Sequence, residues 1–384
     1  MSTKVTPKPF TITIDDDVLE DLKQRLARTR WPDEIPEAPW KYGSSLSYIK
    51  ELIEYWEKEY DWRATERNLN SFAQYTVHLD DIDLHYIHVP GVGPNPMPLI
   101  ISHGWPGSVY EFIKIIGPLT DPARYGGDPK DAFTVVAPSL PGYGFSSLSN
   151  RRRMNMEEMA DIFARLMTEV LGFTRFVAQG GDWGALITTR LGFAYPDQVL
   201  GIHVNMMAAT PHSSEITNLT AAEGEFIQKV QSIRDETGYQ YIQGTRPQTL
   251  AYGLNDSPVG LAAWITEKFY AWTDCHGDIE SSISKDDLLS NIMIYWVTQT
   301  INSSFWLYYQ LRHERWNLQA GERITVPTGF ASFPEEIISP PREWVERVYN
   351  LKHWTEMKSG GHFAALEEPE ALVADIRAFC RDLR

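Results

Sequence analysis

Cysteine is scarce in this sequence, because its 384 residues include only Cys275 and Cys380. Two cysteines are too few for a disulfide framework or for a cysteine-rich metal site. They are typical of a chain that folds in a reducing compartment. We therefore expect a cytoplasmic protein in which neither thiol has a functional role.

Positive charge and long apolar runs are also in short supply. The chain carries 35 basic against 51 acidic residues, for a net charge of -16. Such a surface repels the phosphates of nucleic acids and anionic membranes, so we expect neither as a partner. The start of the chain lacks the apolar core of a signal peptide, and no later run is long enough to span a membrane. The composition predicts a soluble intracellular protein.

What the chain does contain is an alternation of apolar runs and helical patterns. Buried strands are expected at 98–102, 133–137, 176–179, 199–204, 324–328 and 351–355, and helices at 156–171 and 369–383. Strands separated by helices are the pattern of an α/β fold with a mainly parallel, doubly wound sheet.

The first ninety residues form a separate region that precedes this core. Helical patterns lie at 15–30 and 48–60, on either side of a proline-rich stretch at 31–40 that has to run extended. Residues 72–79 and 82–89 then predict an antiparallel hairpin that turns at Asp80 and Asp81. We expect an N-terminal extension over residues 1–90.

Residues 208–320 are dense in aromatic side chains and lack the strand–helix rhythm. An insertion of this length between two strands of one sheet is expected to be a helical cap over their C-terminal edge, where ligands bind in such folds. The core is then divided into 91–207 and 321–384.

The stretch at 176–186 predicts a sharp turn from a strand into a helix, with Asp182 exposed at its tip. Gly180 and Gly184 flank Asp182 as the glycines of a Gly-x-Ser-x-Gly motif flank its serine. A carboxylate is already ionised at neutral pH and attacks saturated carbon, which favours alkyl transfer over ester hydrolysis. The alternative is an ordinary turn in which Asp182 caps the helix.

The segment HGWPGS at 103–108 follows the first core strand directly. A turn of this kind points backbone N–H groups into the site, where they can stabilise an oxyanion. Pro106 has no N–H, so we expect the amides of Trp105 and Trp183 to be the two donors. The alternative is a plain strand-exit loop.

His362 stands in a glycine-flanked loop between the last expected strand and the closing helix. That position suits a catalytic base in the chain order nucleophile, acid, histidine. Its acid should follow the preceding strand, where Glu335 and Glu336 are adjacent. The alternative is a structural histidine.

At this point the sequence resembles the α/β-hydrolase-fold epoxide hydrolases of the microsomal type, over nearly its full length. The matching segments are HGWPGS (103–108), GGDWG (180–184), NDSPV (255–259), FPEE (333–336) and GGHFAA (360–365). Residues 1–90 also resemble the N-terminal region of that family. The chain lacks the membrane anchor of the animal members, which agrees with a soluble protein.

The resemblance implies a role for five side chains. It makes Asp182 the nucleophile, His362 the base and Glu336 rather than Glu335 the acid. It also implies that two cap tyrosines are the acids of ring opening, and these fall on Tyr239 and Tyr308, with Tyr241 and Tyr309 as near neighbours.

The resemblance implies an enzyme that turns an apolar epoxide and water into a vicinal diol through an ester on Asp182. Neither a cofactor nor a metal is expected, the partner is a small-molecule epoxide, and a homodimer is possible. A tyrosine suits this reaction, because its pKa near 10 leaves it protonated at neutral pH yet able to donate.

Two rival functions remain at this stage. A haloalkane dehalogenase shares the aspartate nucleophile, and Trp183 could bind its halide, but a tyrosine pair suits an oxygen leaving group better. A ligand-binding protein on a disabled hydrolase scaffold is the other rival, against which the complete set of Asp182, Glu336 and His362 argues.

Overall fold

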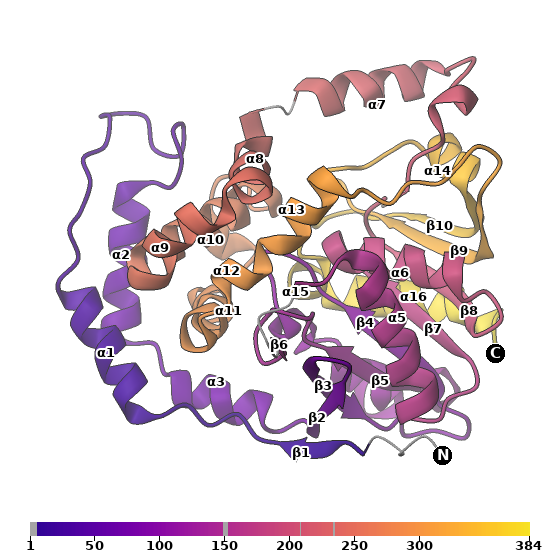
Figure 1. The fold of residues 1–384 in the computed structure, drawn as a ribbon, viewed down its shortest axis with the longest axis horizontal. Helices are drawn as coiled ribbons and strands as arrows, with labels where there is room; N and C mark the ends of the chain where they lie inside the picture. Colours follow the sequence, from indigo (N-terminus) through magenta and orange to yellow (C-terminus); the bar gives the residue numbers. More distant parts are fainter. Residues whose placement is uncertain (1–5, 149–152, 208, 233–234) are drawn as a thin grey trace.

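The computed structural model describes residues 6–148, 153–207, 209–232 and 235–384. Figure 1 shows one sheet with helices on both faces, a layer of helices above one edge of that sheet, and an N-terminal segment that runs along the outside of both.

Ten described strands form a single sheet in the order β1-β2-β3-β5-β4-β7-β8-β9-β10, with β6 paired to β3. They are β1 (Lys8–Phe10), β2 (Gln74–Leu79), β3 (Ile82–Val89), β4 (Met97–Ser102), β5 (Phe133–Pro138), β6 (Ser147–Leu148), β7 (Phe176–Gly180), β8 (Val199–Val204), β9 (Ile324–Ser332) and β10 (Tyr349–Glu356). Pairing is parallel from β5 to β10 and antiparallel from β1 to β3 and between β3 and β5. The predicted α/β fold with a mainly parallel sheet is confirmed, as is the hairpin at Asp80 and Asp81.

Both faces of the sheet are buried, because alternate residues of each strand join different apolar clusters. In β4, Ile100 packs into one cluster, and Leu99 and Ile101 pack into the other. The first cluster contains α5 (Met156–Arg165) and α6 (Asp182–Ala194), and the second contains α4 (Ile116–Thr120), α15 (Ala364–Glu367) and α16 (Pro369–Arg381). This is the doubly wound arrangement that the continuous apolar runs predict.

Some element bounds differ from the expected ones. The helix expected at 156–171 is α-helical only to Arg165 and continues as a π-helical turn over Leu166–Val170. Strand β9 extends four residues beyond the expected end at 328, because Gly329 and Ser332 break the apolar run without breaking the pairing with β10.

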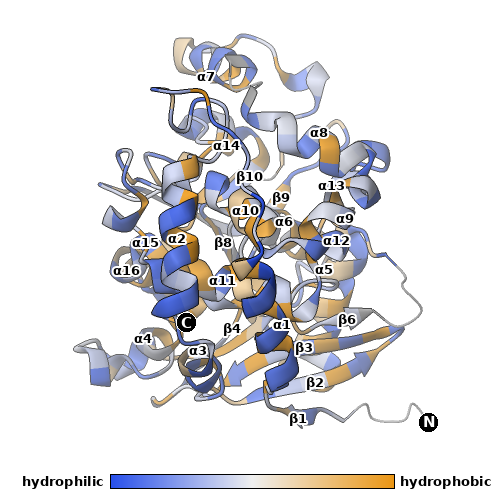
Figure 2. Cartoon of the chain, turned by 90° about the vertical axis from the view of Figure 1, so that its left-hand side faces the viewer, coloured by the Kyte–Doolittle hydropathy of each residue, from blue (hydrophilic) through white to orange (hydrophobic). Residues whose placement is uncertain are grey.

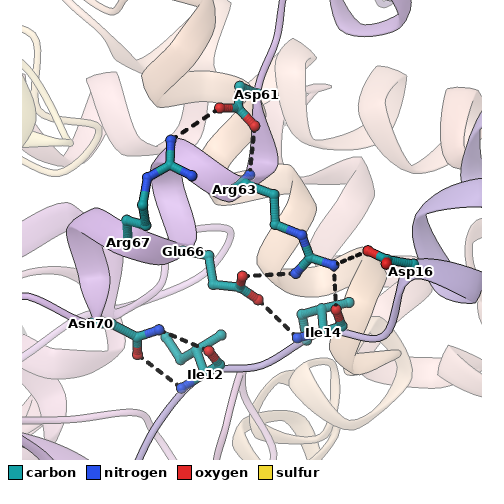
Figure 3. Close-up of polar contacts among 8 residues, drawn as sticks. All are labelled: Ile12, Ile14, Asp16, Asp61, Arg63, Glu66, Arg67 and Asn70. Atoms are coloured by element: carbon teal, nitrogen blue, oxygen red, sulfur yellow. Dashed lines mark hydrogen bonds and ion pairs between the residues drawn. The ribbon is translucent and has the colours of Figure 1, made fainter.

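From residue 6 onward, the N-terminal region contains three helices, α1 (Asp16–Ala27), α2 (Leu46–Lys58) and α3 (Trp62–Leu69), of which the sequence predicts the first two. Figure 2 shows hydrophilic residues along most of α1. Arg63 of α3 binds Asp16, Glu66 and the carbonyl of Ile14, and thereby fastens the segment before α1 to α3 (Figure 3). The stretch at 31–40, which was expected to be extended throughout, turns at residues 36–37 and again from residue 39, with a positive φ at Glu37 and at Trp40, because each follows a proline that favours a turn. The ring of Trp40 stacks on that of Tyr270 with 3.9 Å between centroids.

The sequence between β8 and β9 is helical, as expected for a cap. Its described helices are α7 (Ala221–Ser232), α8 (Gly238–Thr245), α9 (Pro247–Asp256), α10 (Pro258–Trp272), α11 (Lys285–Thr298), α12 (Ile301–Ser304) and α13 (Trp306–His313). Helix α14 (Arg342–Val348) lies outside this insertion, between β9 and β10. Figure 1 places α8 to α13 together above the sheet, with α7 at its outer end. Each helix in the described ranges is too short or too polar to cross a membrane.

Candidate active site

Asp182 lies at the tip of the turn between β7 and α6, with a positive φ of 48°. This is a strained conformation for a residue with a side chain, so its surroundings have to enforce it. A Cβ at Gly180 would overlap the backbone of Gly184, and one at Gly184 would overlap the backbone of Ser102. The two glycines are therefore required by close backbone approach, as the elbow pattern predicts.

The carboxylate of Asp182 does not cap the helix. Gly181 occupies the N-cap position and makes no side-chain cap. Instead, the backbone N–H of Trp105 donates to Oδ1 of Asp182 at 2.7 Å, and Nε2 of His362 lies 3.4 Å from Oδ2. The side chain is directed across the C-terminal edge of the sheet, toward the loop after β4 and the loop after β10.

Of the two expected oxyanion donors, Trp105 contacts this carboxylate and Trp183 is its neighbour in the chain. Trp105 supplies the N–H that contacts Asp182, and its peptide bond to Pro106 is cis. Trp183 follows Asp182 in the first turn of α6, where backbone N–H groups have no carbonyl partner inside the helix.

His362 is paired with Glu336, the one of the two adjacent glutamates that the resemblance implies. Nδ1 of His362 and Oε1 of Glu336 are 2.8 Å apart, and both residues are buried, whereas Glu335 is exposed. Burial alone would lower the pKa of His362, but the carboxylates of Glu336 and Asp182 raise it well above the usual value for histidine. His362 therefore lies between two carboxylates that favour its protonated form.

Tyr239 of α8 and Tyr308 of α13 face each other with ring centroids 5.6 Å apart. Both rings are buried and both contact the ring of Trp105, at 5.2 and 5.7 Å. By contrast, Tyr241 is 60% exposed and Tyr309 stacks on His313. Of the four candidate tyrosines, the structure brings Tyr239 and Tyr308 to Asp182.

A pocket of about 480 Å³ opens from Asp182. Its walls include both tyrosines and are otherwise mostly apolar, with Trp183, Leu186, Met206, Met207, Phe226 and Trp344 among the lining residues. Such a pocket suits an apolar small molecule whose polar end lies against Asp182 and the phenols. Within the described residues, no group of three His, Cys, Asp or Glu side chains is arranged to hold a metal ion.

Two ionisable groups lie near the site although the sequence did not predict them there. Glu111 lines a second cavity of about 20 Å³ together with Asp182 and His362, and burial raises the pKa of Glu111 to about 8. Lys268 of α10 is buried beside the ring of Tyr239. Neither residue belongs to a recognisable motif, so only the fold reveals that both lie near the site.

Comparisons with known proteins show which family this chain resembles. The family description "Epoxide hydrolase N terminus" matches residues 7–112, and "alpha/beta hydrolase fold" matches residues 97–226. A protein named putative epoxide hydrolase from Stigmatella aurantiaca is 42% identical over 98% of this chain and 85% of its own length. Epoxide hydrolase 1 from Oryctolagus cuniculus is 41% identical over 97% of this chain and 88% of its own.

Solved structures give the same result. Juvenile hormone epoxide hydrolase from the silkworm Bombyx mori superposes with a TM-score of 0.90 at 31% identity, and covers 99% of this chain and 95% of its own. The epoxide hydrolase of Aspergillus niger superposes with a TM-score of 0.85 at 31% identity, and covers 100% of this chain and 98% of its own.

Proposed function

This chain belongs to the epoxide hydrolase family, and from that premise we propose that it hydrolyses an apolar epoxide to a vicinal diol through a covalent ester on Asp182. The observation that carries the proposal is the position of the carboxylate. One oxygen accepts the Trp105 N–H at 2.7 Å, and the other lies 3.4 Å from His362 at the foot of the apolar pocket.

In the first step, an oxygen of Asp182 attacks an epoxide carbon and forms an ester bond. The ring C–O bond breaks, and its electron pair stays on the epoxide oxygen, which takes a proton from a phenol. Burial raises the pKa of Tyr239 and Tyr308, so both phenols hold their protons at neutral pH until this oxygen needs one. The products are an alkyl ester and a tyrosinate.

The charge on His362 links the two steps. Asp182 loses its negative charge when it becomes an ester, so His362 keeps only Glu336 as an anionic partner. The pKa of His362 then falls, and the proton that His362 releases restores the tyrosine. Ester formation thereby converts His362 from a cation into a neutral base.

In the second step, His362 takes a proton from a water molecule whose oxygen attacks the ester carbonyl carbon. The amides of Trp105 and Trp183 stabilise the negative charge that develops on the carbonyl oxygen. When the intermediate collapses, the ester C–O bond breaks and the departing diol oxygen takes the second proton of the attacking water, because the first is held by His362. Asp182 returns to the carboxylate and His362 to the cation, so the enzyme is unchanged.

A haloalkane dehalogenase would use the same carboxylate, but two observations favour the epoxide hydrolase. The relatives named above are epoxide hydrolases over nearly the whole chain. In addition, a pair of buried phenols suits a leaving oxygen that needs a proton, which a halide does not. Halide release from chloroalkanes, assayed beside diol formation, is expected to be undetectable.

The proposal is tested by trapping the ester. His362→Gln removes the base of the second step and leaves the nucleophile in place, so the alkyl ester is expected to accumulate. After incubation with styrene oxide, mass spectrometry of the peptide that contains Asp182 should show an increase equal to the mass of the epoxide. Asp182→Asn in the same background is the control, and an unmodified peptide in the His362→Gln protein would refute the covalent route.

A cytoplasmic location and a homodimer stay predictions from the sequence. The sequence leaves the oligomeric state open, and sedimentation equilibrium of the purified chain distinguishes a monomer of 43.9 kDa from a dimer of twice that mass.

A further inference from the structure

Lys268 of α10 is a buried lysine to which the proposed reaction assigns no role. The residue is only 4% exposed, although lysine is rarely buried without a partner. Its Nζ lies 2.6 Å from Oε2 of Glu267, whose side chain is 27% exposed. Lys268 thus makes an ion pair at the edge of the cap and turns the other side of its Nζ toward aromatic rings inside the protein.

The inner neighbours of this ammonium are aromatic rings of the site. Nζ of Lys268 lies 4.6 Å from the ring centroid of Tyr239 and 5.4 Å from that of Trp272. The ring of Tyr239 is also stacked on Trp105, at 5.2 Å and 11° between planes. A cation thus lies over the face of one of the two phenols that line the substrate pocket.

The contact is unequal between the two phenols. Among the described residues, a cation contacts the ring of Tyr239 and none contacts that of Tyr308. Both phenols are buried, so burial does not indicate which of them loses its proton. The position of Lys268 over only one of the rings does distinguish them.

A cation over a phenol ring has its largest effect when the phenol loses its proton. The negative charge of a tyrosinate spreads from oxygen into the ring, so an ammonium over the ring face is attracted more strongly to the ionised form. In a buried site this attraction is little screened by solvent. Burial and the charges of Asp182 and Glu267 raise the pKa of Tyr239, whereas its hydrogen bonds with Gln240 and Tyr308 lower it. The ammonium of Lys268 lies over the ring face and adds an attraction to the ionised form.

We infer that Lys268 is a positioning residue for ring opening, because its ammonium stabilises the tyrosinate that Tyr239 becomes as the epoxide oxygen takes the phenol proton. Tyr239 is then the proton donor, and Tyr308 holds the epoxide oxygen by a hydrogen bond. The inference rests on the proposed function, since it concerns the first of its two steps.

The test is a single-turnover measurement on Lys268→Met, which keeps the length of the side chain and removes its charge. Enzyme in excess is mixed with styrene oxide and quenched at intervals, and the ester on the Asp182 peptide is quantified by mass spectrometry. Ester formation should slow by about tenfold, while the decay of the ester should keep its rate. Lys268→Arg retains a cation and should restore most of the rate.

A double-mutant cycle separates this effect from a loss of packing in the cap. Tyr239→Phe keeps the ring but has no proton to give, so Lys268→Met should slow ester formation no further in that background. In the matched Tyr308→Phe background, Lys268→Met should still slow ester formation by about tenfold. Equal losses in all three backgrounds would show a structural role and overturn the inference.

The same measurements distinguish a failure of this inference from a failure of the proposed function. If the unmodified enzyme forms no ester on Asp182, the covalent route fails. If the ester forms normally and Lys268→Met forms it at the same rate, only the inference about Lys268 fails. Should the methionine variant not fold, Lys268→Gln is the alternative neutral variant, because it keeps a donor for Glu267.

Discussion

The carboxylate of Asp182 has two different partners, and each restricts the position of one of its oxygens. The Trp105 N–H fixes one oxygen, and His362 lies beside the other. Gly104 has to be a glycine because a Cβ there would overlap the side chain of Asp182. A strained φ, a fixed donor and a close glycine together orient one oxygen toward the pocket, which is the preorganisation that nucleophilic attack requires.

The tyrosines give a residue-scale prediction. Replacing Tyr239 and Tyr308 together by Phe removes both phenol protons and leaves the apolar packing of the rings nearly intact. Ester formation should slow by at least about 100-fold, because the epoxide oxygen then leaves as an unprotonated alkoxide. Rapid-quench kinetics with an aryl epoxide measures this rate.

The exposed Tyr241 supplies the control for that variant. Tyr241→Phe, at 60% exposure, should leave the rate unchanged. A double variant that forms ester at the normal rate would mean that neither buried phenol is the acid.

Single positions differed in how well sequence could assign them. Asp182 and His362 follow from glycine spacing and chain order, since each lies just beyond a strand whose apolar run is plain. Glu336 needed the resemblance, because Glu335 and Glu336 are adjacent and equivalent in sequence. The structure separates them by burial, with Glu336 bonded to His362 and Glu335 exposed.

At the scale of elements, helix α16 is fastened to the sheet by a carboxylate. Oδ2 of Asp375 lies 2.8 Å from Nε2 of His203 on β8, and Oδ1 lies 2.6 Å from Nε2 of His353 on β10. Asp375 is buried and contacts two strands at once. These strands flank β9, which leads into the loop of Glu336, so this contact also supports the site.

This contact predicts a dependence of stability on pH. Burial opposes the ionisation of Asp375, but its hydrogen bonds and the charge of His203 outweigh burial and lower its pKa from 3.8 to about 2. Because the folded pKa is depressed, the stabilisation is complete above about pH 4 and is lost as the pH falls toward 2. It amounts to about 2 kcal/mol.

Urea unfolding of the unmodified chain and of Asp375→Asn, at several pH values, measures this contribution. The difference in free energy of unfolding between the two proteins should shrink by about 2 kcal/mol between pH 5 and pH 2.5. A difference that stays constant over this range would show that Asp375 is not stabilised by its charge.

Helices and strands with a clear pattern of apolar residues could be located from the sequence. Those that depend on contacts between distant parts of the chain could not. The strand at 199–204 coincides with β8 as found. The eight-residue helix α3 was not expected, because it has barely two turns and owes its place to contacts such as that of Arg63 with Asp16. Short helices depend on tertiary packing more than on their own propensity.

At the scale of the whole molecule, the N-terminal region braces the cap. Arg25 of α1 binds Asp256 at the end of α9, and Glu51 of α2 binds Lys285 at the start of α11. The partners in the first contact are 231 residues apart in the sequence. No local pattern predicts such pairs, so the sequence anticipated an N-terminal region and a cap without indicating that one supports the other.

The central claim is that the hydroxyl oxygen newly added to the diol comes from the carboxylate of Asp182 and not directly from water. A single turnover with excess enzyme in water enriched in oxygen-18 tests it most directly. The first diol formed should contain no label, because its new hydroxyl oxygen comes from the carboxylate, and one label should appear on Asp182. A diol that carries the heavy oxygen from the first turnover would contradict the covalent mechanism.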